Sequence, residues 1–294
     1  MSHRAQEIPQ TTFLTDRGVL RISGTDAKAF LQGLITNNVD KLNDGNAIFA
    51  GLLTPQGKIL SDFFVVADGD TFLIDVPKDV LEALEKRLSF YKLRSSVSVD
   101  AEPAFRVAAA WGGTPPLPAG AVAFADPRLP ELGDRILLPE NTTFDEASCV
   151  MVGEDEYHTH RIALGIPDGG RDYAYSNAFP HDALYDQLNG VDFNKGCYVG
   201  QEVVSRMHHR NSARTRVVPV EGDAPLSEGA EVMAGTQPVG TIGSVDETRG
   251  LALLRLDRVA SAEAKGASLH AGDTAIKVRL PEFATFELPK AEGA

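Results

Sequence analysis

The sequence has 294 residues, of which 43% are hydrophobic and 23% charged, so it is long enough for two or three domains with apolar cores. Its 41 acidic and 28 basic residues give a net charge of −13, which argues against nucleic-acid binding driven by overall charge. Two cysteines are too few for a disulfide framework, and no apolar run approaches the roughly 18 residues of a membrane-spanning helix. The N-terminus also lacks the apolar stretch of a signal peptide. We therefore expect a cytoplasmic protein with no membrane partner and no direct nucleic-acid partner.

The N-terminal part alternates short apolar runs with two helical patterns. Residues 18–23 predict a strand, and Thr25 or Asp26 can cap a following helix with one apolar face. A second helix is expected from residue 77, because apolar residues then recur at spacings of four. Further strands, the first three in an antiparallel meander, are expected at 47–53, 58–67, 71–76, 96–99 and 105–111.

A stretch rich in proline and glycine, residues 112–120, predicts a loop, which is either a boundary between two lobes or only a surface excursion. Beyond it, the patterns favour helices at 154–164 and at 200–209. Strands mixed with helices, without regular βαβ alternation, indicate an α+β fold and not a doubly wound sheet.

The character of the sequence changes after residue 210. Short apolar runs punctuated by glycines occur at 216–220, 231–234, 240–245, 251–256 and 275–280. Strands at this spacing are typical of a small barrel or sandwich. We therefore divide the chain into an α+β body, residues 1–210, and a C-terminal β-barrel domain, residues 211–294.

The most informative stretch is residues 195–202, which read K-G-C-Y-V-G-Q-E. Cys197 lies between Gly196 and Gly200, which permit close approach of a ligand. If a helix begins near residue 200, its N-terminus and the charge of Lys195 would favour a thiolate at Cys197. The alternative is an inert cysteine in a tight loop before a helix.

This octapeptide resembles the K-G-C-Y-x-G-Q-E signature of the YgfZ family of folate-binding proteins, which are relatives of the glycine-cleavage T-protein. The resemblance spans about residues 18–250, and residues 206–209 are similar to the R-x-H-H of the mitochondrial iron–sulfur assembly members of this family. The other segments that resemble the family, in its order and spacing, are residues 30–37, 54–58, 160–167, 171–172 and 189–193.

The resemblance implies a T-protein-like fold, with a multi-lobed α+β body around a central hole and a small C-terminal β-barrel. It implies tetrahydrofolate, or a derivative, as cofactor near Asp62 and Arg161. Asp62 follows Ser61 where the T-protein has two adjacent aspartates, one of which positions the folate; the alternative is an ordinary strand-edge aspartate. The remaining residues expected to bind the cofactor are Lys195, Tyr198, Gln201 and Glu202. For Gln201 and Glu202, helix capping is an equal alternative.

Arg161 and Ala163 fall where the T-protein reads R-x-E. The glutamate there grips the pterin ring, so Ala163 counts against T-protein chemistry. Arg161 can meet a folate carboxylate through its planar fork, or form an internal ion pair with Glu202 or Asp172.

Two groups of side chains near these motifs invite further interpretation. The histidines at 158, 160, 208 and 209 do not form a convergent set of three or four ligands, so we expect no resident metal site. A basic run between Arg206 and Arg216 is either a solvated face or a place for a polyglutamate folate tail or an acidic partner.

Together these features imply a tetrahydrofolate-binding accessory factor in iron–sulfur cluster assembly or repair. Such a factor would support maturation of [4Fe–4S] proteins, with assembly or client proteins as partners. Cys197 would be the functional thiol, although a lone thiolate cannot hold a cluster. Two alternatives stay open: a folate-dependent aminomethyl or one-carbon transferase in which Asp62 orients the amine, and a factor acting indirectly on tRNA modification. We do not expect a conventional enzyme.

Overall fold

The computed structural model describes residues 8–210 and 213–289. The chain forms two compact units, each assembled from separate stretches of sequence. Unit 1 draws on Met1–Leu53, Leu60–Tyr157 and Leu188–Val199, and unit 2 on Thr54–Ile59, His158–Gln187 and Gly200–Ala294. The domain boundary expected at 210/211 adjoins residues 211 and 212, which lie outside the described residues, so it stays a prediction.

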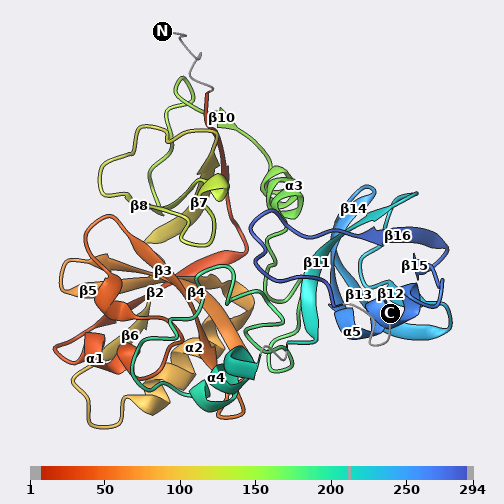
Figure 1. Cartoon of the computed structure of the whole chain (residues 1–294). Helices are drawn as coiled ribbons and strands as arrows, with labels where there is room; N and C mark the ends of the chain where they lie inside the picture. The colour runs from red at the N-terminus through yellow and green to blue at the C-terminus, as the bar shows by residue number, and fades with distance from the viewer. Residues whose placement is uncertain (1–7, 211–212, 290–294) are drawn as a thin grey trace, which may run out of the picture. The chain divides into compact units, whose positions relative to one another are not determined.

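One sheet of unit 1 has the strand order β3-β4-β5-β2-β6 (Figure 1). Phe64 of β4 pairs with Asp75 of β5, and Ile74 of β5 pairs with Leu20 of β2, both antiparallel. The expected meander is therefore confirmed as β3-β4-β5. The strands are β2 (Arg17–Ser23), β3 (Ala47–Leu53), β4 (Ile59–Asp68), β5 (Thr71–Pro77) and β6 (Ser98–Ala101).

Two helices, α1 (Ala27–Gln32) and α2 (Lys78–Tyr91), pack against the apolar face of this sheet. Leu31 of α1 and Leu88 of α2 are fully buried, as their helical spacing predicts. Asp26 precedes α1, but its carboxylate accepts the backbone N–H of Ser96 at 2.7 Å instead of capping the helix. The expected side-chain cap is therefore wrong, because a long-range contact takes the carboxylate.

The second sheet of unit 1 has the order β10-β1-β7-β9-β8, and its core includes Ile136, Leu138 and Phe144. The stretch 112–120 is the loop between β7 and β8. Only β7 was expected from the sequence. The strands are β1 (Gln10–Phe13), β7 (Phe105–Trp111), β8 (Val122–Ala125), β9 (Asp134–Pro139) and β10 (Val150–Met151).

Unit 2 contains a closed six-stranded barrel with the order β11-β14-β13-β12-β15-β16, drawn from cyan to blue in Figure 1. The predicted barrel is confirmed, but Leu256, expected to end a strand, begins α5 (Leu256–Glu263), and β15 was not expected. The strands are β11 (Thr215–Gly222), β12 (Glu231–Ala234), β13 (Gln237–Asp246), β14 (Arg249–Arg255), β15 (Leu269–Ala271) and β16 (Thr274–Val278).

The helices α3 (Glu154–Leu164) and α4 (Gln201–Arg210) lie where the sequence predicts them, and two short 3-10 helices occur at Val39–Lys41 and Pro130–Leu132. Between α3 and α4 the chain is mostly turns. None of the described helices has the length and apolar content needed to cross a membrane.

Candidate functional site

Two of the segments that resemble the YgfZ family lock together in unit 1. The Thr36 hydroxyl donates to the carbonyl of Gly190 at 2.6 Å, and the Asn37 side-chain amide donates to the carbonyl of Asn189 at 2.6 Å. In return, the backbone N–H of Asp192 donates to the carbonyl of Thr36 at 3.1 Å. The loop after α1 therefore holds residues 189–192, which lead into the octapeptide, in place.

Lys195 completes this lock. Its Nζ donates to the carbonyls of Gln32 at 2.8 Å, Ile35 at 2.6 Å and Asn37 at 2.8 Å. An ammonium group has three hydrogens, so all of them are used. Burial lowers the pKa of Lys195 to about 8. Lys195 was expected to support a thiolate at Cys197 by its charge, but its ammonium is committed to the 32–37 loop.

The residues after Lys195 pass from the solvent to the interior. Cys197 is exposed, whereas Tyr198 is buried and Val199 packs against the core of the first sheet. The Tyr198 ring centroid lies 5.1 Å from Lys195 Nζ, and burial raises the pKa of its hydroxyl well above the usual value. The octapeptide thus presents the Cys197 thiol at the surface, between exposed Gly196 and buried Tyr198.

Helix α4 begins at Gln201, directly after Gly200, whose φ of +83° lies in the left-handed region that favours glycine. Glu202, in the first turn, pairs with Arg206 one turn later, with Oε1 and Nη2 3.0 Å apart and both side chains exposed. Of the two ion-pair partners expected for Arg161, Glu202 is therefore bound to another arginine.

Arg161 pairs with the other expected partner, Asp172. Its Nη1 lies 2.8 Å from Asp172 Oδ2, Nη2 donates to Ser244 Oγ at 2.6 Å, and Nε donates to His158 Nδ1 at 2.9 Å. The side chain is fully buried. The structural alternative is the one that forms, and it joins α3 to the barrel strand β13 within unit 2. A role of Arg161 toward folate stays a prediction, and nearby Ala163 offers no carboxylate.

Asp62 lies on β4, an interior strand of the first sheet, and is only 5% exposed. The alternative of an ordinary strand-edge aspartate is therefore wrong. Side chains alternate along a strand, so Asp62 shares its face with Phe64, while Ser61 faces the other side. The buried Ser61 hydroxyl has no hydrogen-bond partner among residues 8–210 and 213–289.

A buried network of arginines and aspartates in unit 1 was missed by the sequence analysis. Asp75 accepts hydrogen bonds from Arg17 and, at 3.1 Å, from Arg135. Asp126 accepts two from Arg128, at 3.0 and 2.8 Å. Burial opposes ionisation of Asp126, but the two nearby arginines outweigh it and hold its pKa below the usual value. The available signal was Asp75, a lone charge in the otherwise apolar strand β5.

Phe64 connects this network to the face that carries Asp62. The guanidinium carbons of Arg135, Arg128 and Arg17 lie 4.6, 4.9 and 5.6 Å from the centroid of its ring. Cation–π contacts of this kind strengthen when they are desolvated. The face around Asp62 is thus rich in cations as well as aromatic side chains.

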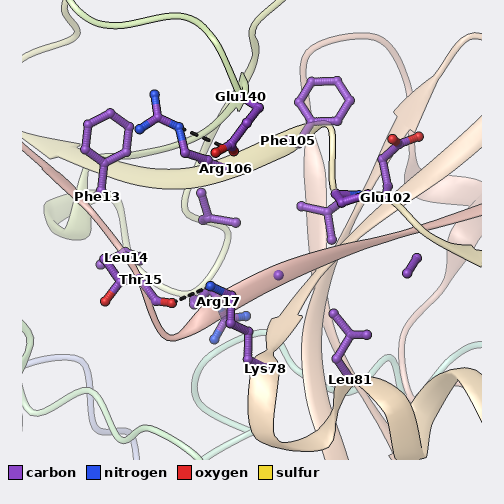
Figure 2. Close-up of a pocket in the computed structure, with 15 residues that line it drawn as sticks. Phe13, Leu14, Thr15, Arg17, Lys78, Leu81, Glu102, Phe105, Arg106 and Glu140 are labelled. Carbon is purple, nitrogen blue, oxygen red and sulfur yellow. Dashed lines mark hydrogen bonds and ion pairs between the residues drawn. The ribbon is translucent and has the colours of Figure 1, made fainter.

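A cavity of about 510 Å³ in unit 1 contains none of the predicted site residues (Figure 2). Its charged side chains already have partners: Arg106 Nε lies 3.6 Å from Glu140, and Lys78 Nζ donates to the Thr15 carbonyl at 2.7 Å. The charges that line this cavity are therefore already compensated within unit 1.

The histidines divide between two places in unit 2. His158 accepts from Arg161, as described above, whereas the rings of His208 and His209 lie 5.7 Å apart. His181, which the sequence analysis did not consider, has its ring centroid 6.3 Å from that of His208. Burial lowers the pKa of His181 to about 4, so this histidine is neutral at pH 7.

Comparison with known proteins identifies the family. The human iron–sulfur cluster assembly factor IBA57, a mitochondrial protein, is 32% identical over 283 residues, covering 84% of this chain and 77% of the human protein. The chain belongs to the IBA57 family. The corresponding factor homologues of Neurospora crassa and Mycosarcoma maydis are each 34% identical, over 240 and 248 residues, and cover 73% and 78% of this chain. The chain spans only 55% and 59% of the length of these two fungal relatives.

The fold is confirmed independently. Residues 214–286 match the family model described as the CAF17 C-terminal beta-barrel domain. The crystal structure of the glycine cleavage system aminomethyltransferase T from Bartonella henselae has a TM-score of 0.77 at 15% identity, covering 95% of this chain and 87% of that one. The expected T-protein-like body with a C-terminal barrel is therefore correct for this IBA57 family member.

The cytoplasmic location expected from the sequence is contradicted. The fungal and human relatives reported above are all mitochondrial factors. Composition and the small number of cysteines do not distinguish the cytoplasm from mitochondria.

Proposed function

We propose that this chain is an accessory factor in the assembly or repair of iron–sulfur clusters, and that it supports maturation of [4Fe–4S] proteins. The observation that carries the proposal is membership of the IBA57 family, whose human member is named an iron–sulfur cluster assembly factor. The exposed thiol of Cys197, held within the family-like octapeptide, gives the proposal a chemical group. Its partners would be cluster-assembly proteins or [4Fe–4S] client proteins.

The two cysteines determine how many thiol ligands the chain can provide to an iron–sulfur cluster. Of its two cysteines, Cys149 is buried, with Sγ 3.7 Å from the carbonyl of Asp145, and Cys197 is exposed. An iron–sulfur cluster generally needs four protein ligands. The chain therefore supplies one accessible thiolate, and a cluster would be cargo shared with a partner protein that contributes the other ligands.

The proposal includes tetrahydrofolate as a bound cofactor, and the residues fit it in part. The buried carboxylate of Asp62 suits a group that accepts hydrogen bonds from a pterin or amine nitrogen. Arg161 is already paired with Asp172, so the fit rests on Asp62. A bound tetrahydrofolate would supply nitrogen atoms that accept a one-carbon group, and Asp62 would orient them.

The cluster role is tested in cells that lack the gene. We expect reduced activity of [4Fe–4S] enzymes under oxidative stress while [2Fe–2S] enzymes keep theirs. The wild-type gene and Cys149→Ser should restore activity, whereas Cys197→Ser should not. Full [4Fe–4S] activity in the deletion strain would sink the proposal.

The folate part is tested separately, by titrating the purified protein with tetrahydrofolate in a calorimeter. We expect micromolar binding that Cys197→Ser and Ser61→Ala retain and that Asp62→Asn weakens at least tenfold. That factor is about 1.4 kcal/mol, the scale of one hydrogen bond to a charged group. No detectable binding to the wild type would remove folate from the proposal and leave the cluster role to the deletion experiment.

A further inference from the structure

Unit 2 contains a cavity of about 460 Å³ that is lined by Arg214, a member of the basic run noted in the sequence, and by none of Asp62, Arg161 and the octapeptide residues. Its wall includes Lys58, from the family-like turn at 54–58, and Met207 of α4. The turn lies close to α4: a Cβ added to Gly57, whose φ is +81°, would come within 3.0 Å of Val203 Cβ. Arg214, just before β11, and Arg255 of β14 also line the cavity. The volume suits a small molecule.

Lys58 and Asp182 face this cavity in contrasting environments. Lys58 Nζ donates to the carbonyl of Asn177 and lies 3.3 Å from the ring centroid of Phe179. Asp182 is 8% exposed and accepts the backbone N–H of Phe179 at 2.8 Å. Burial lowers the pKa of Lys58 and raises the pKa of Asp182 to about 6. Ionisable groups perturbed in this way and gathered around a cavity are typical of functional sites.

Two arginines add positive charge that is only partly compensated. Arg255 binds Asp257 through two hydrogen bonds, at 3.0 and 2.8 Å. Arg214 is exposed, and its charge also helps to lower the pKa of Asp257, after the larger effect of Arg255. Lys58, Arg214 and Arg255 thus line the cavity with one carboxylate, Asp182, and Asp257 pairs with Arg255 from outside the lining, in a chain whose net charge is −13. In the cavity of unit 1, by contrast, Arg106 is paired with a glutamate.

We propose that this cavity binds a small organic anion whose carboxylate or phosphate group is held by Arg214 and Lys58. An arginine fork matches either group through two parallel hydrogen bonds, and a lysine adds a point charge. Met207 and Leu253 provide apolar surface for the body of the ligand. The site shares no residue with Asp62, Arg161 or the octapeptide, so it stands or falls independently of the proposed folate site.

The experiment titrates the full-length chain with inorganic phosphate and, separately, with glutarate, at constant ionic strength. The backbone amide resonances of Thr215 and Leu253, which line the cavity, report binding by NMR. We expect saturable shifts at millimolar concentration. Arg214→Ala and Lys58→Gln should each weaken binding about tenfold, the loss of one charge-assisted hydrogen bond. Asp182→Asn removes a negative charge from the wall and should strengthen binding about threefold.

Arg206→Ala is the matched control, because Arg206 belongs to the same basic run but does not line the cavity. It should leave the affinity unchanged. Tighter binding of phosphate would assign the site to phosphate esters, and tighter binding of glutarate to carboxylates. The proposal is overturned if neither anion saturates the shifts below about 50 mM, or if Arg206→Ala weakens binding as much as Arg214→Ala.

Discussion

Replacing Lys195 by methionine should destabilise unit 1 without removing a ligand contact. The substitution keeps most of the side chain's length but leaves the carbonyls of Gln32, Ile35 and Asn37 without their donor. An unsatisfied buried polar group costs about 1–3 kcal/mol. Residues 34–37 of this loop are buried, so little of that loss can be recovered by turning carbonyls toward water. We therefore expect a loss of about 3 kcal/mol in the free energy of unfolding, which is large for a single substitution.

Urea denaturation followed by tryptophan fluorescence measures this change where it occurs, because Trp111, the one tryptophan, is buried in unit 1. Lys28→Met is the control: Lys28 is exposed and pairs with exposed Asp40, so its loss should cost no more than about 0.5 kcal/mol. The reasoning is refuted if Lys195→Met unfolds at the wild-type urea concentration but no longer binds tetrahydrofolate. That result would mean that the Lys195 ammonium contacts tetrahydrofolate and does not stabilise the 32–37 loop.

Three further predictions concern other buried or exposed groups. Arg161→Met should cost about 3 kcal/mol, because the buried Asp172 carboxylate loses its ion-pair partner and keeps only backbone hydrogen bonds from Asp168 and Ser244, and adding Asp172→Asn should recover part of the loss in urea melts. Cys197→Ser should change the free energy of unfolding by no more than about 0.5 kcal/mol because the thiol is exposed, and a loss above 1 kcal/mol would make it structural. Asp182, with its pKa raised to about 6 from 3.8, contributes stability that is full below pH 3.8 and lost as the pH rises through 6. Asp182→Asn should therefore be more stable than the wild type at pH 7.5, by up to about 3 kcal/mol, and similar at pH 4; equal stability at both pH values would contradict the shift.

The parts of the fold predicted from sequence are those with strong local patterns. The strand β3, seven buried residues in a row, and the helix α2, with its regular apolar spacing, are recognisable without knowing their neighbours. The helix α5 had a signal that was overlooked, since Leu256, Val259 and Ala262 are buried at intervals of three. Strand β15 has only three residues, and its role becomes visible only through pairing in the closed barrel.

The candidate site was harder to predict because its contacts are long-range. Asp172 lies 11 residues from Arg161, close enough in sequence to have been one of two partners considered. The carbonyls that accept hydrogen bonds from Lys195 lie about 160 residues earlier in the chain. Every residue has a backbone carbonyl, so the sequence does not indicate which ones a distant lysine will bind. The pattern showed that the octapeptide was unusual, but it could not show that its lysine points into a loop.

The octapeptide therefore combines two structural roles, anchoring of the backbone and exposure of a thiol, which cannot be assigned to separate residues from the sequence alone. Lys195, Tyr198 and Val199 face inward and fix the backbone by hydrogen bonds and apolar packing. Cys197 faces outward and is the accessible thiol of the chain. A thiol that passes iron or sulfur to a partner must be reachable yet held in one place, because ordering a mobile loop at each encounter would cost about 1–2 kcal/mol for every residue fixed. Under the proposed cluster role of Cys197, the inward-facing residues would serve it by keeping the thiol in one place. Removing the three hydrogen bonds of Lys195 should then reduce the proposed transfer of iron or sulfur from Cys197 to a partner, even at temperatures where unit 1 remains folded.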